Sequence, residues 1–179
     1  PEPFAAFIAD PEANPLATAT GKFEIYCAGL AGYINSVGFS TISPIAKWQI
    51  GDPEQGAGTQ TEEFPLLLWT PHSLRRAHTV NDNVVSLREA FPQECFMSTL
   101  DAEARGIKTR DPVLMTSPHG QVLRPAKVLP TIVPGAVALQ DGAWIRIDEE
   151  TGIDLGGDPN ILQAPKSSGE ASQSWTGTL

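Results

Sequence analysis

The stretch that decides the fold is residues 64–83, which read FPLLLWTPHSLRRAHTVNDN. Residues 64–69 are the densest apolar run of the chain, and a short apolar run followed by turn residues is typical of a buried strand. Residues 70–83 contain Pro71 and an Asn-Asp-Asn run, which indicates an ordered loop. Proteins usually display their binding groups on loops that leave a rigid core. We therefore expect a binding loop on a β scaffold.

The side chains of this loop indicate the chemistry of its ligand. They include three hydroxyls, two arginines and two imidazoles: Thr70, Ser73, Thr79, Arg75, Arg76, His72 and His78. A guanidinium binds phosphate oxygens through paired hydrogen bonds, and hydroxyls complete the shell. The set therefore suits a polyanionic ligand such as a pyrophosphate-linked nucleotide. The alternative from composition alone is a solvated basic loop that balances an acidic protein.

Other catalytic and metal-binding patterns are missing from the sequence. His72 and His78 stand six residues apart in a loop, without a convincing third metal ligand. His119 falls in a turn, where we expect it to be solvated. Cys27 and Cys95 lie in apolar stretches, which favours buried free thiols. The chain also lacks a nucleophile elbow, a phosphate loop and a dinucleotide-binding glycine motif.

Composition bounds the class of protein. The 179 residues suit one compact domain, and Gly and Pro at 16 each favour many turns between short strands. The net charge of −9 argues against a nucleic-acid-binding surface, so we expect no nucleic-acid partner. No apolar run approaches the roughly 18 residues of a membrane span. The first residues lack the basic and apolar regions of a signal peptide, and the start without Met suggests an excised fragment.

The remaining patterns predict six or seven short strands and two small helices. We expect strands at residues 22–27, 64–69, 94–97, 112–116, 121–128 and 135–139. Residues 84–91 favour a helix capped by Asp82 or Asn83. Residues 99–105 favour a second helix, capped by Ser98 or Thr99 and closed by Gly106. From residue 148 the chain is polar and rich in Gly and Ser, so we expect a tail that other protein or a ligand must hold.

Four blocks in order resemble the molybdopterin-dinucleotide-binding domain of the dimethyl sulfoxide reductase family. In residues 64–83, the family's His, Arg, His and Asn fall on His72, Arg76, His78 and Asn83. Residues 14–26, NPLATATGKFEIY, are similar to a segment in which Thr-Gly-Lys leads into a strand. The last two blocks are a short helix and turn, LDAEARGI (100–107), and a strand with a glycine–aromatic corner, PGAVALQDGAW (134–144). The resemblance extends from residue 14 to about 160 and is nearest to catalytic subunits of anaerobic dimethyl sulfoxide reductases.

The resemblance implies a mainly β fold, a six-stranded double-psi β-barrel with short helices and long surface loops. Residues 1–63 would be an N-terminal extension and linker with one strand, and residues 64–147 the barrel core. Residues 148–179 would be a C-terminal tail that completes the cofactor-binding face. The cofactor implied is bis(molybdopterin guanine dinucleotide) molybdenum. The metal's protein ligand and any iron–sulfur cluster would belong to the preceding part, so the chain alone would be inert.

The resemblance also implies which residues contact the cofactor: Thr70, His72, Ser73, Arg76, His78, Thr79, Asn83, Trp144, Asn160 and Ser174. Trp144 is equally consistent with a core aromatic. The family's Asn-Pro is replaced by Ser98 and Thr99, so no contact is carried over there. Arg110 stands where the family has glycine, so either Arg110 adopts a positive φ or the turn differs.

For the parent enzyme, the resemblance implies a molybdenum oxidoreductase that reduces a sulfoxide or a similar oxide or oxyanion. It would work with an iron–sulfur electron-transfer subunit and a membrane anchor, on the outer face of the cytoplasmic membrane. A formate dehydrogenase or nitrate reductase relative is one alternative, because the residues that separate these enzymes lie outside this chain. A non-enzymatic β-barrel module for protein partners is the other, although it has no need for Arg and His among hydroxyls at a strand end.

Overall fold

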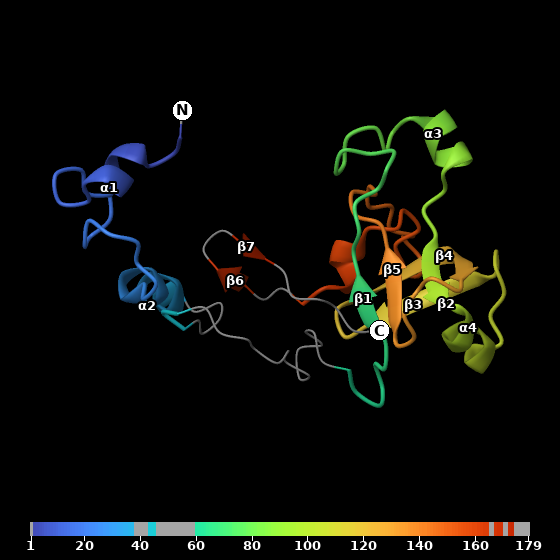
Figure 1. Ribbon diagram of the computed structural model, residues 1–179. Helices are drawn as coiled ribbons and strands as arrows, with labels where there is room; N and C mark the ends of the chain where they lie inside the picture. Colours follow the sequence, from blue (N-terminus) through green and yellow to red (C-terminus); the bar gives the residue numbers. More distant parts are fainter. Residues whose placement is uncertain (1, 38–42, 46–59, 165–166, 170–171, 174–179) are drawn as a thin grey trace. The chain divides into compact units, whose positions relative to one another are not determined.

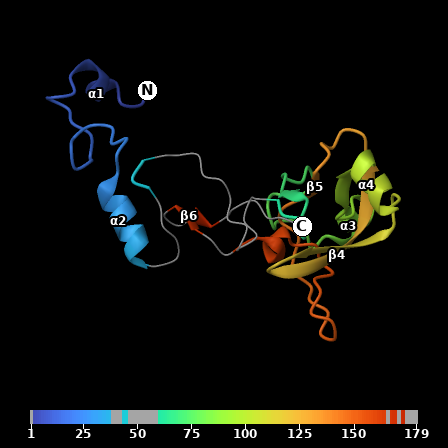
Figure 2. The same ribbon diagram turned by 90° about the horizontal axis from the view of Figure 1, so that it is seen from below.

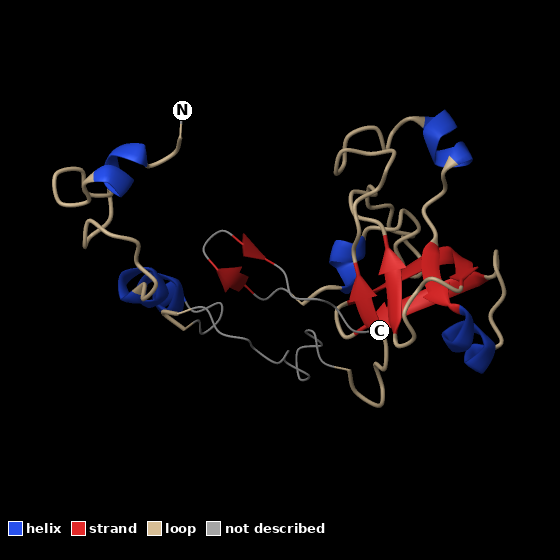
Figure 3. Cartoon of the chain, viewed as in Figure 1, coloured by secondary structure: helices blue, strands red, loops and turns tan. Residues whose placement is uncertain are grey.

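The computed structural model describes residues 2–37, 43–45, 60–164, 167–169 and 172–173. The chain divides into two compact units. The N-terminal unit comprises Pro1–Gln49 and Ser168–Ser172, and the sheet unit comprises Ile50–Ser167 and Gln173–Leu179. Figure 3 shows that most of the described strands belong to the sheet unit. A mainly β fold with a few short helices is therefore confirmed.

The sheet unit is built on a five-stranded sheet in the order β1-β5-β2-β4-β3. Its strands are β1 Leu67–Trp69, β2 Cys95–Ser98, β3 Pro112–Ser117, β4 Gly120–Leu129 and β5 Ala136–Leu139. Two pairs are parallel, β1 with β5 and β2 with β4, and two are antiparallel, β2 with β5 and β3 with β4. Helices α3 (Val85–Ala90) and α4 (Thr99–Arg105) lie at opposite ends of this sheet (Figure 1).

The core of the sheet unit is formed by side chains that alternate along the strands. Leu68 is 1% exposed whereas its neighbour Trp69 is 59% exposed. The predicted strand over 64–69 is shorter than expected and begins at Leu67. Phe64 accepts from the Thr61 backbone N–H in a turn, and Pro65 has no N–H for a ladder, so pairing starts only after Pro65.

The strands predicted over 112–116 and 121–128 and the second predicted helix are confirmed, and the two strands form a hairpin. Strands β3 and β4 pair from Pro112 with Pro125 to Ser117 with Gly120. The Ser98 hydroxyl accepts from the Asp101 N–H at 3.0 Å and caps α4, which Gly106 closes at φ 67°. Arg110 adopts φ 80°, the first of the two alternatives that its position offered.

The predicted cap of α3 is wrong. Val84 holds the N-cap position, and no side chain caps the helix. Asp82 is 3% exposed, and its carboxylate is bonded to other loops. A tertiary ion pair thus outcompetes the local cap that the sequence favours.

Residues 153–164 correct the expectation of a tail that needs outside support. Asp154 bridges to Val122 of β4, and the 3-10 helix η2 (Pro159–Leu162) packs against the sheet with Leu162 fully buried. In Figure 2, the orange segment that precedes residue 154 extends away from β4. The composition of this segment did not predict its packing against the sheet, because the segment contains few apolar residues. A second, two-stranded sheet pairs β6 (Ser167–Gly169) with β7 (Ser172–Gln173).

The N-terminal unit contains α1 (Ala5–Ala9) and α2 (Ala28–Val37). The strand predicted over 22–27 is wrong, because this segment is irregular and leads into α2. Polar groups of this segment form local hydrogen bonds. The Thr18 hydroxyl donates to the Lys22 carbonyl at 2.7 Å, and the Glu24 carboxylate accepts from the Thr20 N–H at 2.9 Å. None of the helices in the described ranges is long and apolar enough to cross a membrane.

Candidate functional site

The predicted binding loop leaves β1 at the α3 end of the sheet (Figure 1). A tight turn closes it, in which the Val80 N–H donates to the Ala77 carbonyl at 3.0 Å and His78 adopts φ 53°. The backbone of Gly142 lies directly against this turn. A Cβ at Gly142 would overlap the His78 carbonyl, and its φ of 80° also favours glycine, so both constraints hold the two loops together.

Arg76 anchors the loop from the inside. Its Nη1 lies 2.8 Å from the Asp82 carboxylate, and its Nη2 donates to the Gln93 side chain at 2.8 Å and to the Asp141 carbonyl at 2.9 Å. The side chain is only 7% exposed. Arg76 was predicted to bind a phosphate group. Both of its Nη groups are instead used to join three segments of the fold.

Two further buried groups, which the sequence reasoning missed, complete this anchor. Asp82 also accepts from the Trp144 backbone N–H at 2.8 Å. Gln93 donates to the carbonyls of Gln140 at 2.6 Å and Gly157 at 2.9 Å. The sequence marked Asp82 only as a helix cap and did not mark Gln93, because the bonds to Trp144, Gln140 and Gly157 span 47 to 64 residues. The polar end of the sheet is thus a preorganised network of buried hydrogen bonds, in which Nε of Arg76 and Oδ1 of Asp141 have no partner among the described residues.

His72 and His78 converge on a single carboxylate oxygen. Their Nδ1 atoms lie 3.2 Å and 3.1 Å from Oδ2 of Asp141, and their ring centroids are 5.0 Å apart. Because Nδ1 of each ring faces Asp141, Nε2 is the nitrogen left for a ligand. Both imidazoles are about three-quarters exposed. The structure therefore brings together the two predicted histidines and adds a residue that neither motif nor spacing indicated.

The same three residues are the group with metal-ligand chemistry among the described residues. One ligand atom from each of His72, His78 and Asp141 lies within 4.8 Å of the others. The sequence offered no third ligand, because Asp141 lies 63 residues beyond His78. A shared hydrogen-bond acceptor accounts for this geometry as it stands.

The other predicted contacts are spread around the histidine pair. Thr70 and Ser73 are half-buried, whereas Thr79 and Asn83 are exposed. Trp144 is 51% exposed and its indole N–H donates to the Thr79 carbonyl at 2.8 Å, so it is not a core aromatic. Asn160 is exposed on η2, and Ser174 lies outside the described residues.

Asp154 holds the segment that supports this end of the sheet. Its carboxylate accepts four backbone N–H groups at 2.7–2.8 Å, from Arg146, Gly156, Gly157 and Asp158. Burial acts to raise the pKa of Asp154, but these bonds together outweigh it and hold the pKa below its usual value. Burial raises the pKa of the neighbouring Asp158 carboxyl.

The donor set fits a large, hydrogen-bonding anionic cofactor. Two exposed imidazoles and an exposed indole surround the loop, and the buried Nε of Arg76 has no acceptor among the described residues. An unpaired buried donor is rare in a complete site. The face therefore has the chemistry to hold phosphate and heterocycle edges.

Comparison with known proteins agrees with this chemistry. Residues 66–174 match the family described as the molydopterin dinucleotide binding domain, and the chain belongs to that family. The match covers the loop, the sheet and η2. It includes nine of the ten predicted contacts within the described residues, with Ser174 at its last position.

Individual relatives are reductases. The chain is 36% identical to a probable dimethyl sulfoxide reductase chain of Escherichia coli K12, over 92% of this chain and 21% of the relative. It is 37% identical to a trimethylamine-N-oxide reductase of Haemophilus influenzae, over 79% of this chain and 17% of the relative. The chain thus spans about a fifth of the length of the curated relatives it matches.

A solved structure confirms the likeness of fold. Acetylene hydratase from Pelobacter acetylenicus superposes with a TM-score of 0.66, over 94% of this chain and 24% of that one, at 18% identity. At this identity the likeness concerns the fold alone.

Proposed function

We propose that this chain covers the pterin-dinucleotide part of bis(molybdopterin guanine dinucleotide) molybdenum in a larger oxidoreductase. The observation that carries the proposal is the exposed pair His72 and His78, clamped by Asp141 at the end of β1. The clamp turns Nε2 of each ring outward, where it meets a ligand without reorganisation. Family membership supports the dinucleotide as that ligand.

The parent enzyme, by this proposal, reduces a sulfoxide or a similar oxide. The names of the relatives support it, because dimethyl sulfoxide and trimethylamine N-oxide both carry an oxygen on sulfur or nitrogen. When bound, the molybdenum centre supplies the oxygen-atom transfer. The chain's own residues bind and orient: the histidines hold polar edges, and Trp144 offers an apolar wall fixed through Thr79. No relative named above favours formate or nitrate as substrate.

The proposal includes a closed form of the sheet. We infer that the five strands belong to a six-stranded double-psi β-barrel. The two parallel pairs, β1 with β5 and β2 with β4, support this, because each joins strands that lie far apart in the chain. An experimental structure of the parent enzyme tests this inference. If no sixth strand pairs with the edge strands β1 or β3 there, the barrel is contradicted.

The partners and location of the parent enzyme follow from the same relatives. We propose an iron–sulfur electron-transfer subunit and a membrane anchor, with the enzyme on the outer face of the cytoplasmic membrane. Similarity to dimethyl sulfoxide reductase chains supports this. Purification of the tagged parent enzyme from membranes should recover an iron-rich partner, and protease added to spheroplasts should cleave the enzyme. Recovery of the enzyme alone in the cytosol would overturn both points.

Cofactor retention tests the central proposal. In the parent enzyme, a His72→Ala/His78→Ala variant should lose molybdenum several-fold, measured by metal analysis after gel filtration. His119→Ala, in the β3–β4 turn, is the matched control and should retain it. Wild-type molybdenum content in the double variant would disprove the role of the pair. The 179-residue chain alone should show no dye-linked sulfoxide reduction, and measurable turnover would disprove its inertness.

A further inference from the structure

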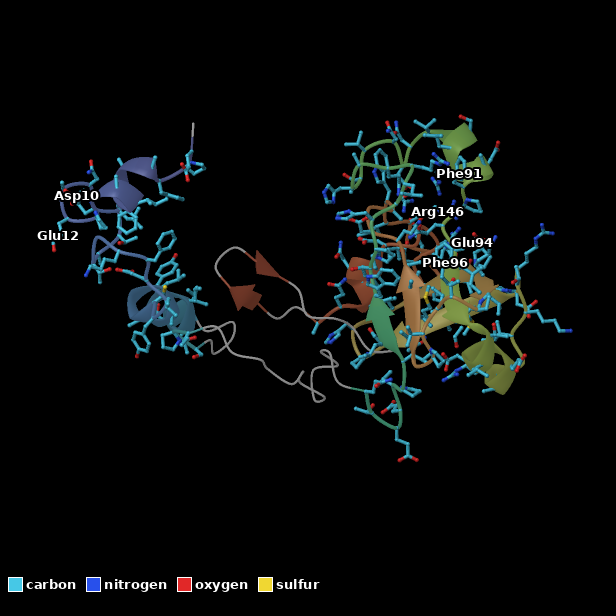
Figure 4. All side chains as sticks on the ribbon, in the orientation of Figure 1. Asp10, Glu12, Phe91, Glu94, Phe96 and Arg146 are labelled. Carbon is cyan, nitrogen blue, oxygen red and sulfur yellow. The ribbon has the colours of Figure 1, made fainter. Side chains whose placement is uncertain are left out.

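An arginine-lined cavity lies beside the binding loop in the sheet unit. Its volume is about 300 Å³, at the lower end of the range for small-molecule sites. Its lining comes from the binding loop, α3, β4 and the segments around residues 146 and 156. Figure 4 shows Phe91 and Arg146 at the α3 end of the sheet, where both line this cavity.

The lining carries an excess of positive charge. It holds four guanidiniums and two carboxylates: Arg76, Arg88, Arg124, Arg146, Asp82 and Glu89. Arg76 and Asp82 neutralise each other in their 2.8 Å ion pair. Three arginines then face Glu89 alone. The nearby carboxylate of Asp154 is already held by four backbone N–H groups.

Two of the arginines are forced together. The Leu155 carbonyl accepts from Nη1 of Arg124 at 2.6 Å and from Nη2 of Arg146 at 3.2 Å. Nε of Arg124 is fixed by the Gln93 carbonyl at 2.8 Å. Burial lowers the pKa of Arg124, and the charges of Arg146 and Arg88 lower it further; Asp154 and Asp82 raise it, but the pKa remains below its usual value. Such repulsion is unfavourable unless an anion offsets it.

Several donors of this cavity are left for a ligand. Among the described residues, the side chain of Arg88 makes no hydrogen bond or ion pair, and Nη2 of Arg124 has no partner. Nε of Arg76, in a side chain that is 7% exposed, also lacks an acceptor. Planar guanidinium donors that converge from separate elements match the oxygens of a phosphate group.

We propose that Arg88, Arg124 and Arg146 form a binding site for the diphosphate group of a nucleotide. Arg76, the arginine that the family pattern suggested, instead holds the scaffold of this site through Asp82 and Gln93. The inference deepens the proposed function and rests on it, because the nucleotide we expect there belongs to the dinucleotide cofactor.

Isothermal titration of the 179-residue chain at low ionic strength tests the site. The probes are inorganic pyrophosphate, GDP and guanosine. We expect pyrophosphate and GDP to bind and guanosine not to bind. An Arg88→Gln/Arg146→Gln variant should weaken binding about tenfold or more, since it removes two charge-assisted donors. Both side chains are exposed, so the fold should survive, which circular dichroism checks. Arg105→Gln, in α4 at the other end of the sheet, is the matched control and should bind like the wild type.

The outcomes separate the site from the function. Failure of pyrophosphate to bind, or equal binding by the double variant, overturns the site. Tighter binding of GDP than of pyrophosphate supports a nucleotide as the source of the diphosphate, and tighter binding of pyrophosphate overturns the nucleotide assignment. In the parent enzyme, Arg88→Gln/Arg146→Gln should also lower the molybdenum content, and unchanged content overturns the assignment to the cofactor. A parent enzyme without molybdenum would overturn the proposed function, while the pyrophosphate result would still stand.

Discussion

The two units of the chain treat their apolar side chains in opposite ways. The sheet unit buries large side chains to 1% exposure or less: Leu68, Met97, Val122, Leu139 and Leu162. Among the described residues of the N-terminal unit, only Ala31 and Ile34 are buried. Its aromatic side chains are more than half exposed at four positions: Phe4, Phe23, Tyr26 and Tyr33.

This difference indicates which unit carries its own stability. Burial of apolar surface contributes about 25 cal/mol per Å², so one buried alanine and one buried isoleucine stabilise a unit only weakly. Exposed apolar surface of this extent usually marks an interface. We therefore expect the N-terminal unit to be the less stable of the two.

The largest expected effect comes from the buried ion pair of the sheet unit. Arg76→Ala leaves Asp82 buried without its cation and Gln93 without a donor, so it should cost about 3–5 kcal/mol of unfolding free energy. Urea denaturation of the chain measures this. Arg75→Ala is the neighbouring control, because Arg75 stacks over Phe91 at the surface and should cost under about 1 kcal/mol. Equal effects would remove the anchor role of Arg76.

The core of the sheet unit should respond almost as strongly. Leu68→Ala creates a cavity under β1 and should cost about 3 kcal/mol in the same denaturation experiment. Leu74→Ala, at a side chain that is 88% exposed, should change stability by less than about 0.5 kcal/mol. A loss at Leu68 no larger than that at Leu74 would refute the assignment of the core.

The Asp154 carboxylate should make the sheet unit acid-sensitive. Its folded pKa lies below the unfolded value, so its stabilisation is present above pH 3.8 and is lost as the pH falls through the folded pKa. Asp158 acts in the opposite sense, because its raised pKa favours the folded state as it becomes protonated. Asp154→Asn should lower the unfolding free energy by about 2 kcal/mol at pH 7. The variant should also lose less stability than the wild type between pH 7 and pH 3, because it lacks the Asp154 carboxylate. Urea midpoints at pH 7 and pH 3 measure both effects, and an unchanged pH dependence in the variant would contradict this role.

The smallest expected effect lies in the N-terminal unit. Phe23 is 67% exposed and contacts the rings of Phe4 and Phe7 at centroid distances of 5.8 and 6.1 Å. Phe23→Ala should therefore cost under about 1 kcal/mol in the 179-residue chain. In the parent enzyme the same change should cost more, because we expect the ring to be covered there. A loss in the isolated chain that matches Leu68→Ala would break the contrast between the units.

Local patterns predicted the local structure well. Ser98, Gly106 and the β3–β4 hairpin lie where the sequence indicates, because each depends on bonds between residues close in the chain. The failures share a different cause. Asp82 does not cap α3, because its carboxylate pairs with Arg76 and the Trp144 N–H. Residues 22–27 alternate like a strand but find no strand to pair with in the described residues, and local side-chain bonds take over.

The sequence by itself determined the chemistry of the binding loop: which hydroxyls, imidazoles and guanidiniums follow the first core strand, and hence the kind of ligand they suit. Only the tertiary structure decided how these groups are used. It turned Arg76 inward, joined His72 and His78 through Asp141, and gathered Arg88, Arg124 and Arg146 around one cavity. The physical reason is that a charged side chain bonds to whichever partner the folded backbone brings within about 3 Å. Asp141, 63 residues beyond His78, was invisible to any local pattern.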